Sequence, residues 1–297
     1  MKLATTLAAL VILGPIAHAE SEQLSLDGGV VNVSGSHRGV SRDYLVSPSG
    51  SELTGQMKFL VTEPSLGGEA MKFSDLALFS IAGRWAVFEK VEISLGASFL
   101  AKQPSFTDEK PWQSVNGAIR AALGRRAALQ VTGAGGHLIA HEGMWTKQAL
   151  HVQWRKPIAR VLQFDLAGGL DGTTVSASDV SSAYIAEAAV MTSALFREPT
   201  GHWGAWVGLG YAVPIASRGE DPTTRMRVDP QPRLDFRIGT VLSLVDKWDL
   251  FAELAIVDRG DMSDPTTRLP IIDGGFDQQQ IMMGVTRHFD APRRTPR

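Results

Sequence analysis

The chain contains many segments of about ten residues in which apolar side chains alternate with small or polar ones. In residues 91–99, the odd positions carry Val, Ile, Leu, Ala and Phe, and the even positions carry Glu, Ser, Gly and Ser. Successive side chains of a β-strand point to opposite faces, so such a segment forms a strand with one apolar and one polar face. The repeated pattern predicts an all-β protein.

The connections between these segments alternate between short and long. We expect strands at residues 52–62, 75–87, 91–101, 113–124, 127–137, 145–155, 161–170, 183–196, 202–213, 233–245, 248–257 and 277–289. The longer connections are 63–74, 102–112, 138–144, 171–182, 214–232 and 258–276. Sorting of loops by length is typical of transmembrane β-barrels, whereas a soluble sandwich has no reason for it. The sequence therefore predicts a transmembrane antiparallel up-and-down β-barrel of about 12 strands.

The N-terminus has the pattern of a secretory signal peptide. Lys2 precedes an apolar stretch over residues 3–16, which is followed by Ala17-His18-Ala19, a small-x-small cleavage site. The stretch is shorter than the roughly 20 apolar residues of a spanning helix. We therefore expect a signal peptide at 1–19, then an N-terminal segment at 20–51 that is a tail, a plug or an extra strand. The barrel follows at 52–289, and a disordered tail at 290–297.

Composition excludes several classes of protein. The net charge is −2, and the Arg-rich end at 292–297 is short, so we expect no nucleic-acid partner. The chain has no cysteine, which excludes disulfides, thiolate zinc sites and a lipid-modified cysteine. The acidic stretch at 258–264 matches no EF-hand loop, so we expect neither a metal site nor a cofactor.

Four tryptophans share a position in the pattern. Trp85, Trp154, Trp203 and Trp248 lie on the apolar face of their strands, at the end next to a short connection. Aromatic rings gather where hydrocarbon meets the lipid headgroups. The placement predicts an aromatic girdle on the side of the short turns, although core tryptophans of a soluble protein are the alternative.

The last strand resembles the terminal strand of Gram-negative outer-membrane proteins, because its alternate apolar positions end in Phe289. The resemblance covers residues 52–289 and concerns this porin-like class, with no characterised family matched. It implies a location in the outer membrane, contact with outer-membrane lipid and lipopolysaccharide, and recognition by the outer-membrane assembly machinery. Two features depart from the pattern: Arg287 stands at a position that is usually apolar or aromatic, and eight residues follow Phe289.

The face opposite the apolar one carries charges of both signs. The candidate pore-lining residues are Lys58, Arg84, Glu92, Arg120, Asp165, Glu187, Arg233, Asp235, Arg237 and Glu253, and Lys147 and His151 share their face. In a lumen only a few side chains across, opposed Arg and Glu residues should pair and narrow the space. The small residues Gly204, Gly208 and Gly210 on one strand leave room for water or for a folded-in loop.

These patterns favour a narrow passive channel for small polar solutes. A non-conducting structural or surface-interaction barrel is the first alternative. An outer-membrane lipid-modifying enzyme is the second, but His137, His141 and His202 have no Ser partner at a telling spacing, so we expect no enzyme. We also expect the connection at 214–232 to face the outside of the cell.

Overall fold

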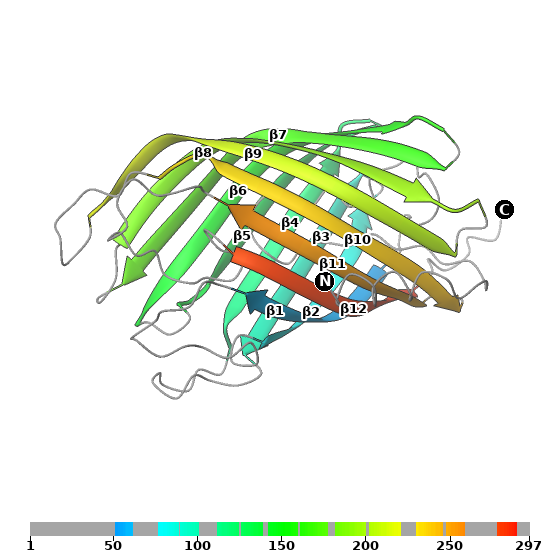
Figure 1. Ribbon diagram of the computed structural model, residues 1–297, viewed down its shortest axis with the longest axis horizontal. Helices are drawn as coiled ribbons and strands as arrows, with labels where there is room; N and C mark the ends of the chain where they lie inside the picture. The colour runs from blue at the N-terminus through cyan, green and yellow to red at the C-terminus, as the bar shows by residue number, and fades with distance from the viewer. Residues whose placement is uncertain are drawn as a thin grey trace, which may run out of the picture.

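The chain forms a single closed β-barrel (Figure 1). The computed structural model describes residues 51–61, 77–88, 90–100, 112–124, 126–138, 142–159, 161–177, 182–199, 202–220, 230–245, 248–258 and 278–289. In this part of the chain the strands are β1 (Ser51–Val61), β2 (Ala77–Phe88), β3 (Val91–Leu100), β4 (Ser114–Ala122), β5 (Ala127–His137), β6 (Gly143–Pro157), β7 (Leu162–Ala177), β8 (Ser182–Arg197), β9 (Trp203–Glu220), β10 (Arg233–Val245), β11 (Trp248–Asp258) and β12 (Gln278–Phe289).

Every strand pairs antiparallel with its neighbours in sequence, and β1 closes the barrel by pairing with β12 from Ser51↔Phe289 onwards. The predicted antiparallel up-and-down barrel of about 12 strands is therefore confirmed. The expected signal peptide, the segment before Ser51 and the tail at 290–297 lie outside the described residues. Among the described residues, no helix is long and apolar enough to cross a membrane.

The two ends of the barrel differ in their connections. We call the end with the connections 89–90, 123–126, 158–161, 198–202 and 246–247 the turn end. The other end, with the connections 62–76, 101–113, 138–142, 178–181, 221–232 and 259–277, is the loop end. The predicted strict alternation of short and long connections is wrong in two places, because 138–142 and 178–181 are no longer than connections at the turn end.

The connection 178–181 is short because β7 runs further than its sequence suggested, and β9 also runs further than expected. Residues 171–177 belong to β7 and residues 214–220 belong to β9, although both stretches were expected to be loop. Glycines and Pro214 are loop signals in a sequence. In the structure, the register between β8 and β9 shifts where Glu187 pairs with Pro214 and Ala186 pairs with Ala216. A β-bulge is one of the few places where a sheet accepts proline, so the strand continues past it.

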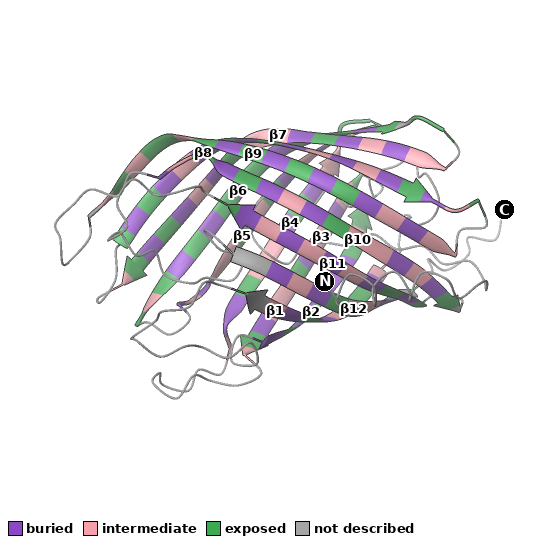
Figure 2. Cartoon of the chain, in the orientation of Figure 1, coloured by how far each residue is buried: buried purple, intermediate pink, exposed green. Residues whose placement is uncertain are grey.

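The outer face of the barrel is apolar and the inner face is polar, which reverses the arrangement of a soluble core. Along β8 in Figure 2, buried residues alternate with exposed or intermediate ones. On β3, Leu95 is 58 % exposed and its neighbour Ser94 is 4 % exposed. Soluble monomers rarely expose apolar patches beyond a few hundred Å². A belt of exposed Leu, Val, Ile and Phe on every side is the lipid-facing surface of a transmembrane barrel.

Aromatic side chains lie on the outer face at both ends. Trp85, Trp154 and Trp248 are exposed at the turn end, where half-exposed Trp203 donates a hydrogen bond to Thr240 Oγ1. Exposed rings also occupy the outer face towards the loop end: Phe79, Phe99, Tyr184 and Tyr211. Sequence reasoning missed this second group because it considered only tryptophan.

Candidate functional site: the barrel lumen

The structure places every candidate pore-lining residue inside the barrel. The ten candidates, together with Lys147 and His151, are all buried and all point away from the apolar outer face. Five further charged residues that the sequence analysis did not select also point inward: Glu52, Arg155, Asp171, Arg197 and Asp249. In the described strands, the lumen therefore contains eight Lys or Arg side chains and eight Asp or Glu side chains.

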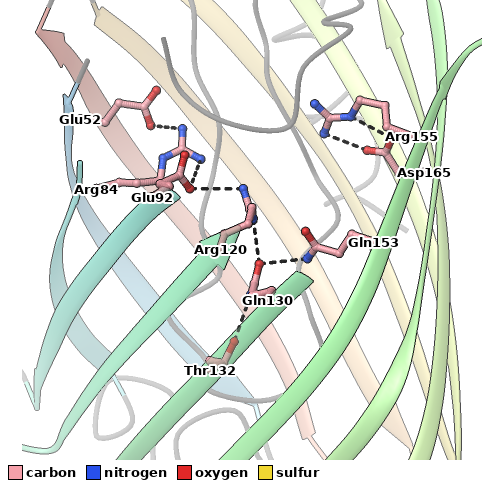
Figure 3. Close-up of polar contacts among 9 residues, drawn as sticks. All are labelled: Glu52, Arg84, Glu92, Arg120, Gln130, Thr132, Gln153, Arg155 and Asp165. Carbon is pink, nitrogen blue, oxygen red and sulfur yellow. Dashed lines mark hydrogen bonds and ion pairs between the residues drawn. The ribbon is translucent and has the colours of Figure 1, made fainter. Parts of the chain in front are cut away.

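Two groups of polar contacts lie along the wall near the turn end, one from β1 to β6 and one between β6 and β7 (Figure 3). We call this set the turn-end belt; its members are Glu52, Arg84, Glu92, Arg120, Gln130, Gln153, Arg155 and Asp165. Glu52 lies opposite Arg84 in the register, Glu92 opposite Arg120, and Arg155 opposite Asp165. Direct cross-strand neighbours are within side-chain reach, so the strand register itself brings the opposite charges together.

The contacts of the belt are close to continuous. Arg84 Nη2 donates to Glu52 Oε2 at 2.6 Å, while its Nη1 lies 3.5 Å from Glu92 Oε1. Arg120 donates to the same Glu92 oxygen at 3.3 Å and to Gln130 Oε1 at 2.9 Å. Gln153 Nε2 also donates to Gln130 Oε1, at 2.9 Å. These side chains lie along the wall and bond to one another.

The last link of the belt is a bidentate ion pair. Arg155 Nε and Nη2 donate to the two carboxylate oxygens of Asp165, at 3.0 and 3.1 Å, and Gln163 donates to Asp165 Oδ2 at 2.9 Å. Two parallel charge-assisted hydrogen bonds fix the guanidinium in one orientation. Arg155 was missed from the sequence although it lies two residues from Gln153 on the same face, because it stands next to a predicted short turn.

A second group lies in the half of the lumen towards the loop end. We call Arg233, Asp171, Glu187, Asp235 and His151 the Arg233 cluster. Arg233 donates from Nη1 to Glu187 at 2.6 Å, from Nη2 to Asp171 at 2.9 Å and from Nε to Asp235 at 3.1 Å. His151 Nε2 lies 2.9 Å from Asp171 Oδ1. One guanidinium thus joins carboxylates of β7, β8 and β10.

Arg233 can reach across β9 because the inward residues of that strand nearest to it, Gly210 and Ala212, are small. A Cβ atom on Gly210 would lie 3.0 Å from Asp235 Cβ and 3.4 Å from Met191 Cε. A Cβ atom on Gly208 would meet Ser193 at 3.6 Å and Arg237 at 3.8 Å. The space that the sequence indicated for water or for a loop is therefore occupied by side chains of β8 and β10.

The lumen also contains two apolar groups. Leu195, Trp206, Val241 and Phe251 pack together near the turn end. Leu138, Trp145, Val175 and Ile185 pack together near the loop end. Trp206 donates to Glu253 Oε2 at 2.9 Å, and Glu253 Oε1 accepts from Arg237 at 3.3 Å. Sequence reasoning expected a polar inner face throughout, although Trp206 alternates with Gly204 and Gly208.

The lining side chains are packed. Lys58 and Gln153 are 0 % exposed, Arg155 is 1 % exposed, and even Glu52 is only 8 % exposed. A lumen holding a wide column of bulk water would leave its lining exposed. The structure therefore describes a narrow, filled lumen.

The histidines considered for catalysis are dispersed. His137 is half-buried, and its ring lies 4.5 Å from that of Trp112, centroid to centroid. His202 is half-buried beside β9 near the turn end, and His141 lies outside the described residues. Within the described strands and turns, no group of three or more His, Asp or Glu side chains has the arrangement of a metal site.

No protein-family model and no curated protein matches the chain. Solved structures do match. An outer-membrane channel from Pseudomonas putida F1 is 12% identical, with a TM-score of 0.48, over 84% of this chain and 98% of that one. The translocator domain of the autotransporter NalP from Neisseria meningitidis is 10% identical, with a TM-score of 0.48, over 84% and 90%. A KdgM porin is 8% identical, with a TM-score of 0.43, over 80% and 99%.

These matches have TM-scores below 0.5, so no conclusion about this chain rests on them. The closed antiparallel barrel, its apolar outer face and its polar inner face define the class on their own. The chain has the architecture of a transmembrane β-barrel protein.

Proposed function

We propose that this protein resides in the outer membrane of a Gram-negative bacterium and acts as a narrow passive channel for small polar solutes. In this proposal the signal peptide is cleaved after Ala19, and the outer-membrane assembly machinery inserts the barrel among phospholipid and lipopolysaccharide. The terminal strand β12, which ends at Phe289, supports this route.

The observation that carries the proposal is the ionised lining of the lumen. A purely structural interior gains little from buried ion pairs, because well-packed apolar residues of similar volume are often as stabilising or more so. Here sixteen Lys, Arg, Asp and Glu side chains occupy the inner face, from Asp249 at the turn end to Arg233 near the loop end. A polar pathway gives these residues a role that stability alone does not give them.

A non-conducting scaffold is the second candidate, and one observation favours it. The lining side chains are buried and bonded to their neighbours, as Arg155 is to Asp165. A barrel filled in this way needs side-chain movement before a solute can pass. The channel proposal therefore predicts a small conductance, whereas the scaffold proposal predicts no conductance. Neither candidate includes catalysis, and phospholipid turnover by the purified protein would show that the third possibility, a lipid-modifying enzyme, has to be reconsidered.

Single-channel recording with a matched pair of arginine variants tests the proposal. Arg120 belongs to the turn-end belt, whereas Arg287 is exposed on the outer face beside Trp248. We expect small, stepwise conductance from the wild type, a higher conductance and a shift towards cations in Arg120→Ser, and wild-type behaviour in Arg287→Ser. If correctly folded wild type and Arg120→Ser are both silent, the channel is excluded and the scaffold stands.

A further inference from the structure

A basic residue, Arg287 of β12, stands on the apolar outer face at the turn end. It is exposed, and its neighbours in the strand register are Leu53 of β1 and Trp248 of β11. Arg287 is one of the two departures from the terminal-strand pattern, and it lines no part of the lumen. Among the described residues, no carboxylate pairs with it. The proposed channel therefore leaves this cation without a role.

Two aromatic rings contact the guanidinium of Arg287. Its central carbon lies 5.2 Å from the centre of the Trp248 ring and 5.1 Å from the centre of the Phe289 ring. A cation over the face of an aromatic ring at such a distance is attracted by the ring. Contacts of this kind leave the N–H groups of the guanidinium available for hydrogen bonds to oxygen atoms. The rings thus position the charge, and its donors are left for a ligand.

The position of Arg287 along the barrel axis indicates which ligand it meets. Trp248 belongs to the exposed tryptophans of the turn end, together with Trp85 and Trp154. Aromatic girdles of this kind lie where hydrocarbon meets the lipid headgroups. The anionic group at that depth is the phosphate of a phospholipid. A guanidinium can donate two parallel hydrogen bonds to a phosphate, which matches the donors that the rings leave available.

The turn end as a whole is basic, whereas the loop end is acidic. The turn-end connections contain Lys90, Arg125, Arg126, Arg160 and Lys247 against Glu89, Glu198 and Asp246, and Lys156 and Arg287 add two positive charges on the adjoining outer face. The loop-end connections contain seven Lys or Arg residues against thirteen Asp or Glu residues. Extending every connection by one residue on each side changes neither sign. An anionic lipid surface is therefore attracted by the turn end and repelled by the loop end.

We propose that the outer face of the turn end binds anionic phospholipid, with the phosphate of one headgroup on Arg287. Phosphatidylglycerol has the required chemistry, because its headgroup carries a phosphate without an ammonium group. The ammonium of phosphatidylcholine is repelled by the basic residues around the site. This inference rests on the membrane location within the proposed function but not on conduction, so it applies to a scaffold as well as to a channel.

Native mass spectrometry of the folded protein in detergent tests the inference. The protein is incubated with equal amounts of phosphatidylglycerol and phosphatidylcholine that have the same acyl chains, and the bound lipids are counted. We expect the wild type to retain several-fold more phosphatidylglycerol than phosphatidylcholine. A parallel sample contains inorganic phosphate at the concentration of the lipids. Inorganic phosphate should not displace the lipid, because it has no acyl chains to contact the apolar outer face.

Three variants locate the site. Arg287→Gln removes the charge and should reduce bound phosphatidylglycerol several-fold. Arg126→Gln removes the same charge from the exposed turn between β4 and β5, and it should leave most of the bound lipid. Trp248→Leu keeps every charge and removes one of the two rings, so it should also reduce the bound lipid. This last variant covers the case in which Arg287→Gln does not fold.

The possible results separate the lipid site from the channel. Equal losses in Arg287→Gln and Arg126→Gln would show that only net charge matters, and they would overturn the site at Arg287. Equal retention of the two lipids by the wild type would overturn it too, and so would displacement by inorganic phosphate, which would indicate a site for free phosphate. Silent single-channel recordings from protein that retains phosphatidylglycerol would remove the channel and leave the lipid site.

Discussion

Removal of Arg233 is the most informative perturbation of the lumen, because one side chain there contacts three carboxylates. Arg233→Met keeps the approximate length of the side chain and deletes the charge. The Nη1, Nη2 and Nε contacts to Glu187, Asp171 and Asp235 are all lost. His151 retains its contact with Asp171.

The expected cost follows from the burial of this cluster. Breaking a buried ion pair by removing one partner costs about 3–5 kcal/mol, because the remaining charge is left uncompensated. We expect Arg233→Met to lower the free energy of unfolding by about this amount. Arg126→Met, in the exposed turn between β4 and β5, should change it by less than about 0.5 kcal/mol. Urea or guanidinium unfolding of the barrel in lipid vesicles, followed by tryptophan fluorescence, measures both.

A second substitution, Glu187→Gln, tests whether the loss of ion pairing causes the expected destabilisation. In the wild type, Glu187→Gln weakens a charge-assisted hydrogen bond of 2.6 Å and should destabilise by about 1.5–3 kcal/mol. In the Arg233→Met background the same change removes one of several like charges, so it should stabilise the barrel instead. The reasoning is refuted if Glu187→Gln destabilises equally in both backgrounds, or if Arg233→Met costs no more than Arg126→Met.

Three further predictions concern the outer face, β9 and the topology. Leu95→Arg, at the middle of β3 and exposed to lipid, should cost about 2–4 kcal/mol in vesicle unfolding, whereas Leu123→Arg at the turn end should cost about 0–1 kcal/mol; equal costs would contradict a lipid-facing belt. Gly210→Val should cost about 1–3 kcal/mol in the same assay because it overpacks the lumen against Asp235, whereas Gly133→Val, which points outward into open space, should be tolerated. An epitope tag inserted at residues 221–229 should bind antibody on intact cells, and binding only after permeabilisation would reverse the proposed orientation.

The alternation of the strands made the fold predictable from the sequence. In a barrel every strand has one face towards lipid and one towards the lumen, so the period of two persists along each strand, as it does from Val91 to Phe99 on β3. The same alternation identified the inward direction of each of the ten candidate residues. It failed at the ends of β7 and β9, and in β9 Pro214 is accommodated at the bulge opposite Glu187.

The sequence did not predict which charged residues pair with one another, because the alternation of apolar and polar residues does not fix the strand register. Which residue of one strand faces which residue of the next depends on the register, and a shift by one residue would reverse every face. The contact between Arg233 and Asp171 also spans two intervening strands, β8 and β9. No local pattern encodes a contact of that kind, and Asp171 itself was hidden in a stretch expected to be loop.

The small residues of β9 affect both the interpretation of the strand pattern and the pairing of the charges. In the sequence, Gly208 and Gly210 indicated free space inside the barrel. In the structure, that space lets Asp235 and Met191 approach each other above the strand, so that Arg233 can reach the carboxylates of β7 and β8. A polar channel lined by side chains that each contact only their direct neighbours would need no such gap. The glycines therefore make room for the Arg233 cluster, and a larger side chain at Gly210 should weaken the contacts of Arg233 together with the stability of the barrel.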